Sequence, residues 1–154
     1  MLDAIDRRIL EILQDNGRIS NTDLAEQINL SPTPCLKRVK KLEKLGVITG
    51  YKAIVDLDKT GLSISGLVLL KLSDSKKETV TAFGEAIKKI SAITECHMTT
   101  GRIDYVAKIH TKDFHDYENL VKDELADLPS LLSMETLFLF GTIVPEDAAD
   151  VGAE

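Results

Sequence analysis

The chain has few cysteines and no long apolar run. Its only two cysteines among 154 residues, Cys35 and Cys96, lie far apart and outside any C-x-x-C pair, so neither a disulfide framework nor a structural zinc site is expected. Each is expected to be a small core residue. No window approaches the roughly 20 apolar residues of a membrane-spanning helix, and residues 1–6 lack a cationic start followed by an apolar run. We therefore expect a cytoplasmic protein without a membrane partner.

Acidic residues outnumber basic ones, but the two signs are segregated along the chain. The net charge of −6 by itself argues against a nucleic-acid partner, because phosphate binding needs a basic surface. However, residues 31–52 hold six Lys/Arg against one Asp/Glu, whereas residues 53–154 hold ten against eighteen. With 44% apolar composition, the chain is able to bury one ordinary core or two small ones. The charge pattern predicts two parts with different partners.

Start and stop signals predict two short helices in the first thirty residues. The first helix is expected from about Asp3 to Gln14, where apolar residues recur on one face before the break at Asn16-Gly17. Ser20 is expected to cap the second helix, and Asn29 suits its end. Only a few residues separate this helix from the next.

The third predicted helix begins at Ser31 and is cationic. The Ser31 hydroxyl is expected to cap it, Pro32 suits its first turn, and Gly46 suits its end. An inward stripe is predicted for Leu36, Val39, Leu42 and Leu45, which recur every three residues. Two helices joined so tightly, the second carrying the cations, are typical of a helix-turn-helix that reads DNA.

The reading helix offers two groups of candidate DNA contacts. Short polar side chains near the start of such a helix approach base edges, and long cations reach phosphates. The base-edge or groove candidates are Ser31, Thr33, Pro34 and Lys37, and the phosphate candidates are Arg38, Lys40 and Lys41. Arg38 has a second interpretation, as a bidentate reader of guanine. Tight helical pairs with a basic face also occur in protein-binding modules, so that alternative stays open.

The residues after Gly46 predict a wing and a linker. The β-branched segment 47–55, broken by Gly50, is typical of a short hairpin or wing followed by a linking strand. We therefore assign residues 1–52 to a winged helix-turn-helix domain of three helices and residues 53–65 to a linker strand or hinge.

Residues 66–145 alternate between strand and helix periods. Strands are predicted over 67–72, 93–99, 105–111 and about 132–140, and helices over 76–90 and about 113–128. The order βαββαβ predicts a ferredoxin-like domain, an antiparallel sheet with both helices on one face, and makes the whole chain α+β. Residues 67–70 and 137–140 are apolar on both sides, so a second subunit is expected to cover the other face. Residues 146–154 form a predicted acidic tail.

Short motifs in both halves connect the chain to a known family. In the first half they are Asn16-Gly17-Arg18-Ile19-Ser20-Asn21, Leu30-Ser31-Pro32-Thr33-Pro34-Cys35-Leu36 and Gly46-Val47-Ile48. In the second half they are Glu95-Cys96-His97, Gly101 and Asp104-Tyr105. On these residues the chain resembles the Lrp/AsnC family of bacterial transcriptional regulators over nearly its whole length. The resemblance implies a regulator that dimerises, assembles dimers into tetramers or octamers, and changes its DNA binding when a small amino acid binds between C-terminal domains.

The resemblance also directs attention to a G-x-x-D turn, here Gly101 to Asp104, at an interface between dimers. A free amino acid needs a carboxylate or carbonyls for its ammonium group and N–H groups or a cation for its carboxylate. Asp104 is the ammonium candidate, and the further contacts are Thr99, Thr100 and the Gly101 backbone. Additional candidates from the apposed subunit are Ser133, Glu135 and Thr136. As a pattern alone, Asp104 is more typical of a turn-capping carboxylate.

An enzymatic function is not expected. His97, His110 and His115 are not spaced as a metal site, and none belongs to a recognisable nucleophile or carboxylate constellation. No metal or cofactor is predicted besides the effector, for which leucine, methionine or another small amino acid is the candidate. The expected partners are double-stranded DNA, this amino acid and further copies of the chain, in the cytoplasm at the nucleoid. The competing hypothesis is a metabolite-binding ferredoxin-like module whose helical domain binds protein.

Overall fold

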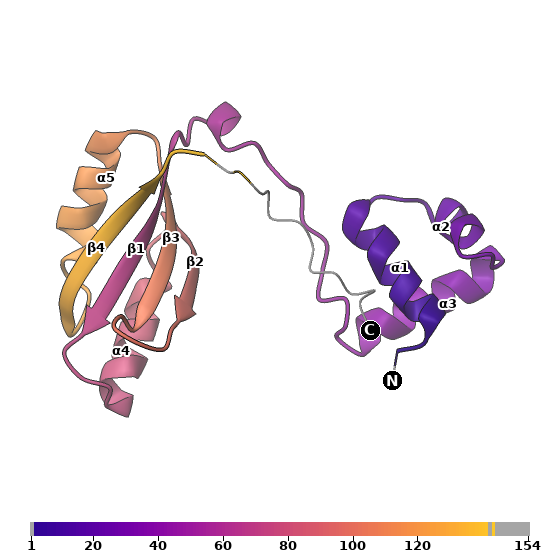
Figure 1. Ribbon diagram of the computed structural model, residues 1–154, viewed down its shortest axis with the longest axis horizontal. Helices are drawn as coiled ribbons and strands as arrows, with labels where there is room; N and C mark the ends of the chain where they lie inside the picture. The colour runs from indigo at the N-terminus through magenta and orange to yellow at the C-terminus, as the bar shows by residue number, and fades with distance from the viewer. Residues whose placement is uncertain (1, 142, 144–154) are drawn as a thin grey trace. The chain divides into compact units, whose positions relative to one another are not determined.

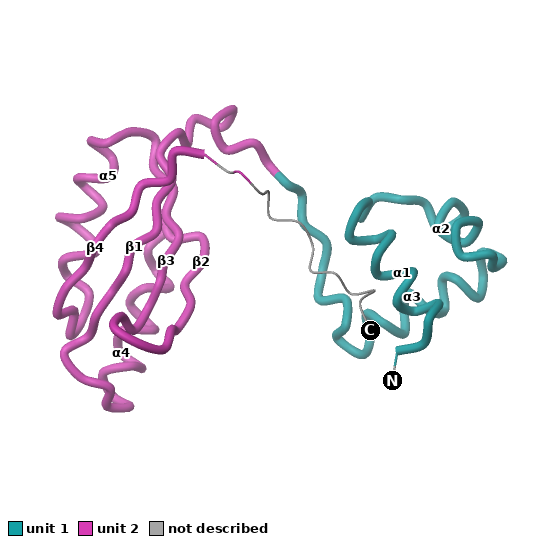
Figure 2. Tube along the Cα trace, in the orientation of Figure 1, with its two compact units in different colours: residues 1–54, 144–154 teal, residues 55–143 magenta. Residues whose placement is uncertain are grey.

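The computed structural model describes residues 2–141 and 143 and forms two compact units, Met1–Ile54 and Val55–Ile143 (Figure 2). Each unit has its own cluster of buried apolar residues, and the two clusters share no residue. Each unit therefore folds around side chains from its own stretch of sequence. The predicted acidic tail, residues 146–154, lies outside the described residues.

The N-terminal unit is helical and begins its first two helices with side-chain caps. Its helices are α1 (Ala4–Asp15), α2 (Asn21–Gln27) and α3 (Pro32–Lys44) (Figure 1). The Asp3 carboxylate accepts a hydrogen bond from the Asp6 N–H at 2.8 Å, and the Ser20 hydroxyl accepts one from the Asp23 N–H at 3.1 Å. Such caps satisfy amides that have no partner inside the helix. The three predicted helices are confirmed within one or two residues at their ends.

Two left-handed residues turn the chain on either side of α3. Asn29, with a φ of 53°, separates α2 from α3, and Gly46, with a φ of 70°, follows the end of α3. Glycine adopts this conformation without steric cost, and asparagine tolerates it better than most residues. The Asn21 side chain then donates a hydrogen bond to the Pro32 carbonyl at 2.8 Å, which joins the starts of α2 and α3.

The predicted inward stripe of α3 is partly wrong. Leu42 is completely buried, but Leu36 is 42% exposed and Leu45 is 63% exposed. Each residue advances about 100° around a helix, so a repeat of three drifts by about 60° at each step and places Leu36 and Leu45 about 180° apart. Cys35 is completely buried and Val39 is half-buried, so α3 packs through positions spaced four and three apart.

The predicted hairpin after α3 is also wrong. Residues 47–55 contain no strand, although Tyr51 holds the segment to α3 by donating a hydrogen bond to Glu43 Oε1 at 3.0 Å. Extended backbone needs a neighbouring strand for its amides and carbonyls, and no described residue of the chain provides one here. The segment therefore leaves Val47, Tyr51, Ile54 and Val55 exposed.

The C-terminal unit has the predicted βαββαβ order. Its elements are β1 (Ile64–Leu72), α4 (Lys77–Ile87), β2 (Ile93–Met98), β3 (Tyr105–Thr111), α5 (Phe114–Leu120) with a π-helical continuation η2 (Val121–Leu125), and β4 (Leu131–Leu139). The strands form one antiparallel sheet in the order β2-β3-β1-β4. β1 begins three residues before its predicted start, inside the predicted linker, and a short 3₁₀ turn (Asp58–Thr60) precedes it.

Strand alternation divides the side chains between two faces of the sheet. Val68, Leu70 and Leu72 of β1 point toward the helices, where they pack with Phe83 of α4 and Leu125 of η2. Both helical segments therefore cover the same face (Figure 1). The opposite side, which we call the open face, carries the remaining strand residues. Its apolar members are Leu67, Leu69, Val106, Leu137 and Leu139.

The two cysteines differ in environment. Cys35 is completely buried in the N-terminal core, as predicted, but Cys96 is exposed, which corrects the expectation for that residue. Cys96 lies on β2, an edge strand of the sheet, which among the described residues pairs with β3 alone. An apolar strand pattern does not distinguish an edge strand from a central one.

Phe83 tests whether the two cores are independent. Its side chain is completely buried, with its ring centroid 4.6 Å from that of Tyr105. Phe83→Ala is expected to lower the free energy of unfolding of the C-terminal unit by about 3–5 kcal/mol. Hydrogen–deuterium exchange should then accelerate at amides of β1 and β3 but not at those of α1–α3. Equal acceleration in both units would show that the cores are coupled.

Candidate functional sites

The outward side of α3 is a narrow cationic stripe. Thr33, Lys37, Lys40 and Lys44 are all exposed and recur at intervals of three or four residues. At about 100° per residue they fall within roughly 60° of arc, opposite the buried Cys35 and Leu42. The exposed Leu36 lies beside this stripe and was not among the predicted contacts. An apolar side chain there suits contact with a thymine methyl group.

Ser31 occupies the cap position of α3, but its hydroxyl makes no capping hydrogen bond. The cap hydroxyl of a helix usually accepts from the N–H of the second or third helical residue, and the third residue here is Pro34, which has no N–H. The predicted capping role is therefore corrected. Ser31 and Thr33 are exposed and Pro34 is half-buried, all at the end of α3 that would enter a groove.

Arg38 is held in an ion pair with α1. One guanidinium nitrogen, Nη1, lies 2.7 Å from both Asp3 Oδ2 and Asp6 Oδ1. The Asp6 side chain is only 1% exposed, and Lys41 Nζ lies 3.8 Å from its other oxygen. The hydrogen bond from Arg38 holds the pKa of the Asp3 carboxyl below its ordinary value. Arg38 thus joins α3 to α1 through Nη1, and its role as a phosphate anchor or guanine reader stays a prediction.

The turn between β2 and β3 is fixed by its own hydrogen bonds. The Thr99 hydroxyl donates to the Ile103 carbonyl at 2.8 Å, and the Thr99 N–H donates to the Asp104 carbonyl at 2.9 Å. Gly101 has a φ of 118°, a conformation that residues with a side chain rarely adopt, and Thr100 is exposed. The predicted turn therefore presents a defined backbone.

Asp104 makes two strong contacts with β1. Its Oδ2 accepts a hydrogen bond from the Leu72 N–H at 2.8 Å, and its Oδ1 lies 3.0 Å from Lys71 Nζ. These contacts, the backbone one first, hold the pKa of the Asp104 carboxyl below its ordinary value. The carboxylate is therefore charged and oriented, and it is already paired with a cation of the same chain.

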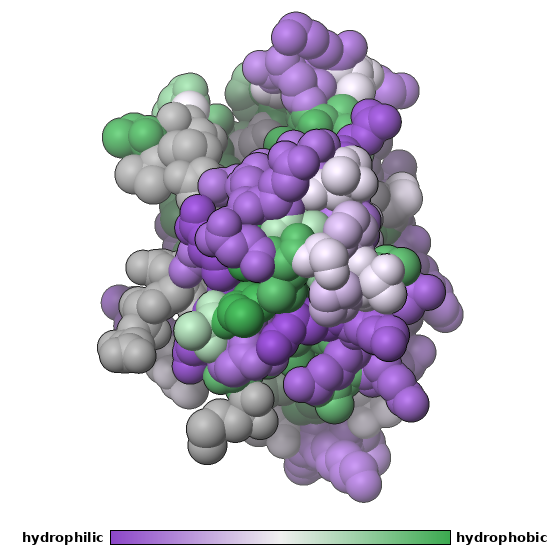
Figure 3. All heavy atoms as spheres, turned by 90° about the vertical axis from the view of Figure 1, so that its right-hand side faces the viewer, coloured by the Kyte–Doolittle hydropathy of each residue, from purple (hydrophilic) through white to green (hydrophobic). Residues whose placement is uncertain are grey.

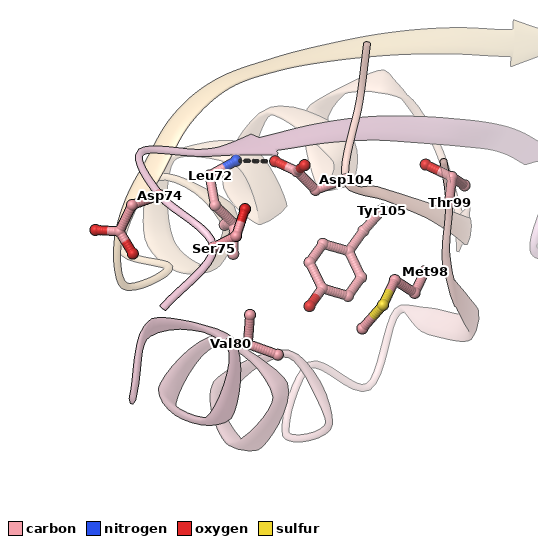
Figure 4. A pocket seen from close by; sticks show the side chains of 8 residues that line it. All are labelled: Leu72, Asp74, Ser75, Val80, Met98, Thr99, Asp104 and Tyr105. Carbon is pink, nitrogen blue, oxygen red and sulfur yellow. Dashed lines mark hydrogen bonds between the residues drawn. The ribbon is translucent and has the colours of Figure 1, made fainter. Parts of the chain in front are cut away.

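A small pocket of about 180 Å³ lies beside this turn, on the helix-covered side of the sheet (Figure 4). It is lined by Leu72, Asp74, Ser75, Val80, Met98, Thr99, Asp104 and Tyr105. Figure 4 shows the Tyr105 ring between Val80 and Met98, with Asp104 above it. The pocket thus combines apolar walls with two carboxylates, and it includes Thr99 and Asp104 from the predicted effector set.

The predicted candidates on β4 do not share one face. Ser133 and Glu135 lie on the open face, whereas Thr136 lies on the helix-covered side and accepts a hydrogen bond from the Tyr117 hydroxyl at 2.9 Å. Adjacent strand residues point to opposite faces, so these three residues cannot line one surface. Ser133 is opposite Lys71 of β1, a residue that the sequence prediction missed. The available signal was a single lysine in an otherwise apolar strand.

Both halves of the chain match protein-family models. Residues 2–49 match a model of winged helix-turn-helix DNA-binding domains, and residues 65–149 match the Lrp/AsnC ligand-binding domain. The chain is 42% identical over 135 residues to the leucine-responsive regulatory protein of Haemophilus influenzae, covering 88% of this chain and 81% of that protein. It is 39% identical over 142 residues to the transcriptional regulator AzlB of Bacillus subtilis, covering 92% and 90% of the two chains.

The chain belongs to the Lrp/AsnC family. Solved structures agree: a Neisseria meningitidis regulator in complex with L-methionine has a TM-score of 0.89 at 28% identity, with 94% of this chain and 93% of that chain covered. Escherichia coli AsnC has a TM-score of 0.84 at 26% identity, covering 94% and 95%. The protein is a DNA-binding transcriptional regulator with an amino-acid-binding domain, and the match of residues 2–49 favours DNA over protein as the partner of its helical half.

Other sites are not evident in the part of the chain that the structure describes. No group of three or more His, Cys, Asp or Glu side chains among these residues is placed to hold a metal ion. No helix among them has the length and apolar character needed to cross a membrane. The curated relatives named above are transcriptional regulators.

Variants of Arg38 and Lys40 distinguish a structural contact from a DNA contact in this Lrp/AsnC protein. Arg38→Ala leaves the Asp6 carboxylate buried without its cation, and we expect the free energy of unfolding to fall by on the order of 3 kcal/mol in urea titrations. Lys40→Ala is expected to leave stability unchanged and to lower the slope of log affinity against log salt by about one unit in anisotropy titrations with duplex DNA.

A double variant provides the control for this prediction. Asp6→Leu with Arg38→Met replaces both charges by apolar groups and should recover much of the lost stability. Its salt slope should equal that of the wild-type protein if the contact of Arg38 with α1 takes the place of a phosphate contact. A lower slope in this folded double variant would return Arg38 to the set of phosphate contacts.

Proposed function

We propose that this Lrp/AsnC regulator binds double-stranded DNA as a homodimer or a larger assembly of dimers, in the cytoplasm at the nucleoid, and that a small amino acid changes this binding. The observation that carries the proposal is the exposed cationic stripe on α3 in a chain with a net charge of −6. Such a local basic surface supports phosphate contact despite the acidic average. The C-terminal unit, in which acidic residues outnumber basic ones, is the proposed site of effector binding and assembly.

Within α3, the proposed DNA contacts divide by position and length. Ser31, Thr33, Pro34 and Lys37 are the proposed base-edge or groove contacts, because they lie in the first two turns of the helix. Lys40 and Lys41 are the proposed phosphate contacts, because both are exposed and lie farther along the helix. Lys41 Nζ lies 3.8 Å from Asp6, but its side chain stays 57% exposed. Arg38 is left out of the set because its guanidinium is paired with α1.

The open face of the C-terminal sheet supports the proposal of a homodimer. Its leucines remain partly accessible, with Leu137 and Leu139 each more than 40% exposed. Figure 3 presents a different side of the molecule, the right-hand side of Figure 1, where hydrophilic side chains surround smaller apolar patches. A contiguous apolar sheet face is typical of an interface. Since one short helix reads few base pairs, a two-fold dimer would also supply the second reading helix that specificity needs.

The proposed effector site is the turn between β2 and β3 with its neighbouring pocket. Thr99, Thr100, Gly101 and Asp104 supply polar groups, and the apolar walls of the pocket suit a short side chain. Ser133 and Glu135 are the proposed contacts from an apposed subunit, and Thr136 is left out of the proposal because its hydroxyl accepts a hydrogen bond from Tyr117. The relative from Neisseria meningitidis was solved with L-methionine, which supports methionine or leucine as the first ligands to try.

If the open face forms the dimer interface, a charged substitution on it should lower the mass of the assembly in solution. Leu137→Lys places a charge on the open face, and by two-fold symmetry twice in each dimer. We expect sedimentation velocity to show a shift toward the 17.0 kDa monomer. Thr81→Lys adds the same charge at an exposed position of α4, on the helix side of the sheet, and should leave the mass unchanged. A dimer that survives Leu137→Lys would place the interface elsewhere.

The effector proposal predicts stabilisation by particular amino acids. A ligand that binds only the folded protein stabilises it by about 2.7 kcal/mol at a concentration of 100 times its dissociation constant. Differential scanning fluorimetry against the twenty amino acids should therefore raise the melting temperature for one or a few of them. The Lys40→Ala variant, altered only in the DNA-binding stripe, should show the same shift. If none of the twenty changes the melting temperature, the regulator acts without an amino-acid effector.

A further inference from the structure

Lys71 lies on the open face beside Asp104, the proposed contact of the effector's ammonium group. β1 is the strand between β3 and β4, so on the open face Lys71 is flanked by Asp104, which directly precedes β3, and by Ser133 on β4. Its side chain is 36% exposed, and Nζ lies 3.0 Å from Asp104 Oδ1. An ammonium group has three N–H donors, and this contact uses one of them. Lys71 is therefore placed to bind a second anion beside Asp104.

An irregularity in β1 orients the pair. The pairing of β1 with β4 shifts register between Lys71 and Leu72, as at a β-bulge, and the Leu72 N–H donates to Asp104 Oδ2 at 2.8 Å. Bulges redirect side chains and are frequent beside functional sites. Asp104 thus contacts the open face through Lys71 and also lines the small pocket on the other side. One carboxylate connects the two surfaces at this end of the sheet.

Charged residues of both signs lie near this end of the sheet. Besides Asp104, Glu135 lies on the open face opposite Leu69, two residues along β1 from Lys71. Lys108, also on that face, lies 3.5 Å from Glu95 on β2 and so belongs to another ion pair. Arg102, exposed within the turn, is the second cation near Asp104 in the sequence. Lys71 is the cation held directly against Asp104.

We propose that Lys71 binds the α-carboxylate of the effector while Asp104 binds its α-ammonium group. This inference rests on the proposed effector site at the same turn. A free amino acid carries both charges on one carbon, so beside the Lys71–Asp104 pair each of its charges meets an opposite one. A ligand with only one of the two charges leaves one member of the pair without a new partner. The site consequently selects free amino acids over amines and peptide N-termini.

Calorimetric titration with matched acids and amides tests the role of Lys71. The probes are L-methionine with L-methioninamide and L-leucine with L-leucinamide, at about pH 6 so that the amides keep their ammonium charge. Wild-type protein should bind at least one of the acids about tenfold or more tightly than its amide, the effect of one charged hydrogen bond. Lys71→Met should weaken binding of the acid by about that factor, should not weaken binding of the amide, and should bring the ratio to about one or below.

Two further variants keep the test specific to Lys71. Arg102→Met removes the other nearby cation and should preserve the preference for the acid, and Lys71→Arg should largely restore it. Melting curves of the variants establish that each is folded. If Lys71→Met retains the wild-type preference, or Arg102→Met abolishes it, Lys71 is not the carboxylate partner. If wild-type protein binds neither acid, the proposed effector site itself is wrong for these ligands, and the inference falls with it.

Discussion

Phe83 of α4 and Leu125 of η2 are both completely buried against the same face of the four-stranded sheet. This packing decides which strand residues face the helices and which lie on the open face. Because side chains alternate along a strand, filling one face with Val68, Leu70 and their neighbours turns Leu67, Leu69 and Lys71 to the other. One contact surface thus produces both an apolar face suited to a second subunit and the position of the proposed effector contact.

Ion pairs within the chain decide which charged side chains are available to DNA or to a ligand. Arg38 and Lys37 are adjacent in sequence and both cationic, but Arg38 is paired with α1 whereas Lys37 is exposed. The same holds at the turn between β2 and β3, where Asp104 is paired before any ligand arrives. The ion pair of Arg38 with the buried Asp6 is costly to break, because Asp6 would be left without its cation. At the partly exposed pair of Lys71 with Asp104, a ligand that carries both charges offers each member an opposite charge.

The sheet also relates effector binding to assembly in space. Lys71 and the apolar residues Leu67 and Leu69 are successive outward positions of one strand, so the proposed ligand and the proposed interface use the same row of β1. A ligand at Lys71 therefore lies at the end of the surface that a second subunit would cover. Differential affinity of the ligand for two assembly states is the physical route by which it would change DNA binding.

The sequence by itself determined what depends on neighbours along the chain. Caps at Asp3 and Ser20, the left-handed Gly46 and the strand and helix periods specified the elements and the α+β class, because each signal acts within a few residues. Only the tertiary structure decided the partner of Arg38, the exposure of Cys96 on an edge strand, the direction of Thr136 and the contact of Lys71 with Asp104. Each of these four features depends on residues that are distant along the chain. Their contacts depend on packing and strand order, which local periodicity does not encode.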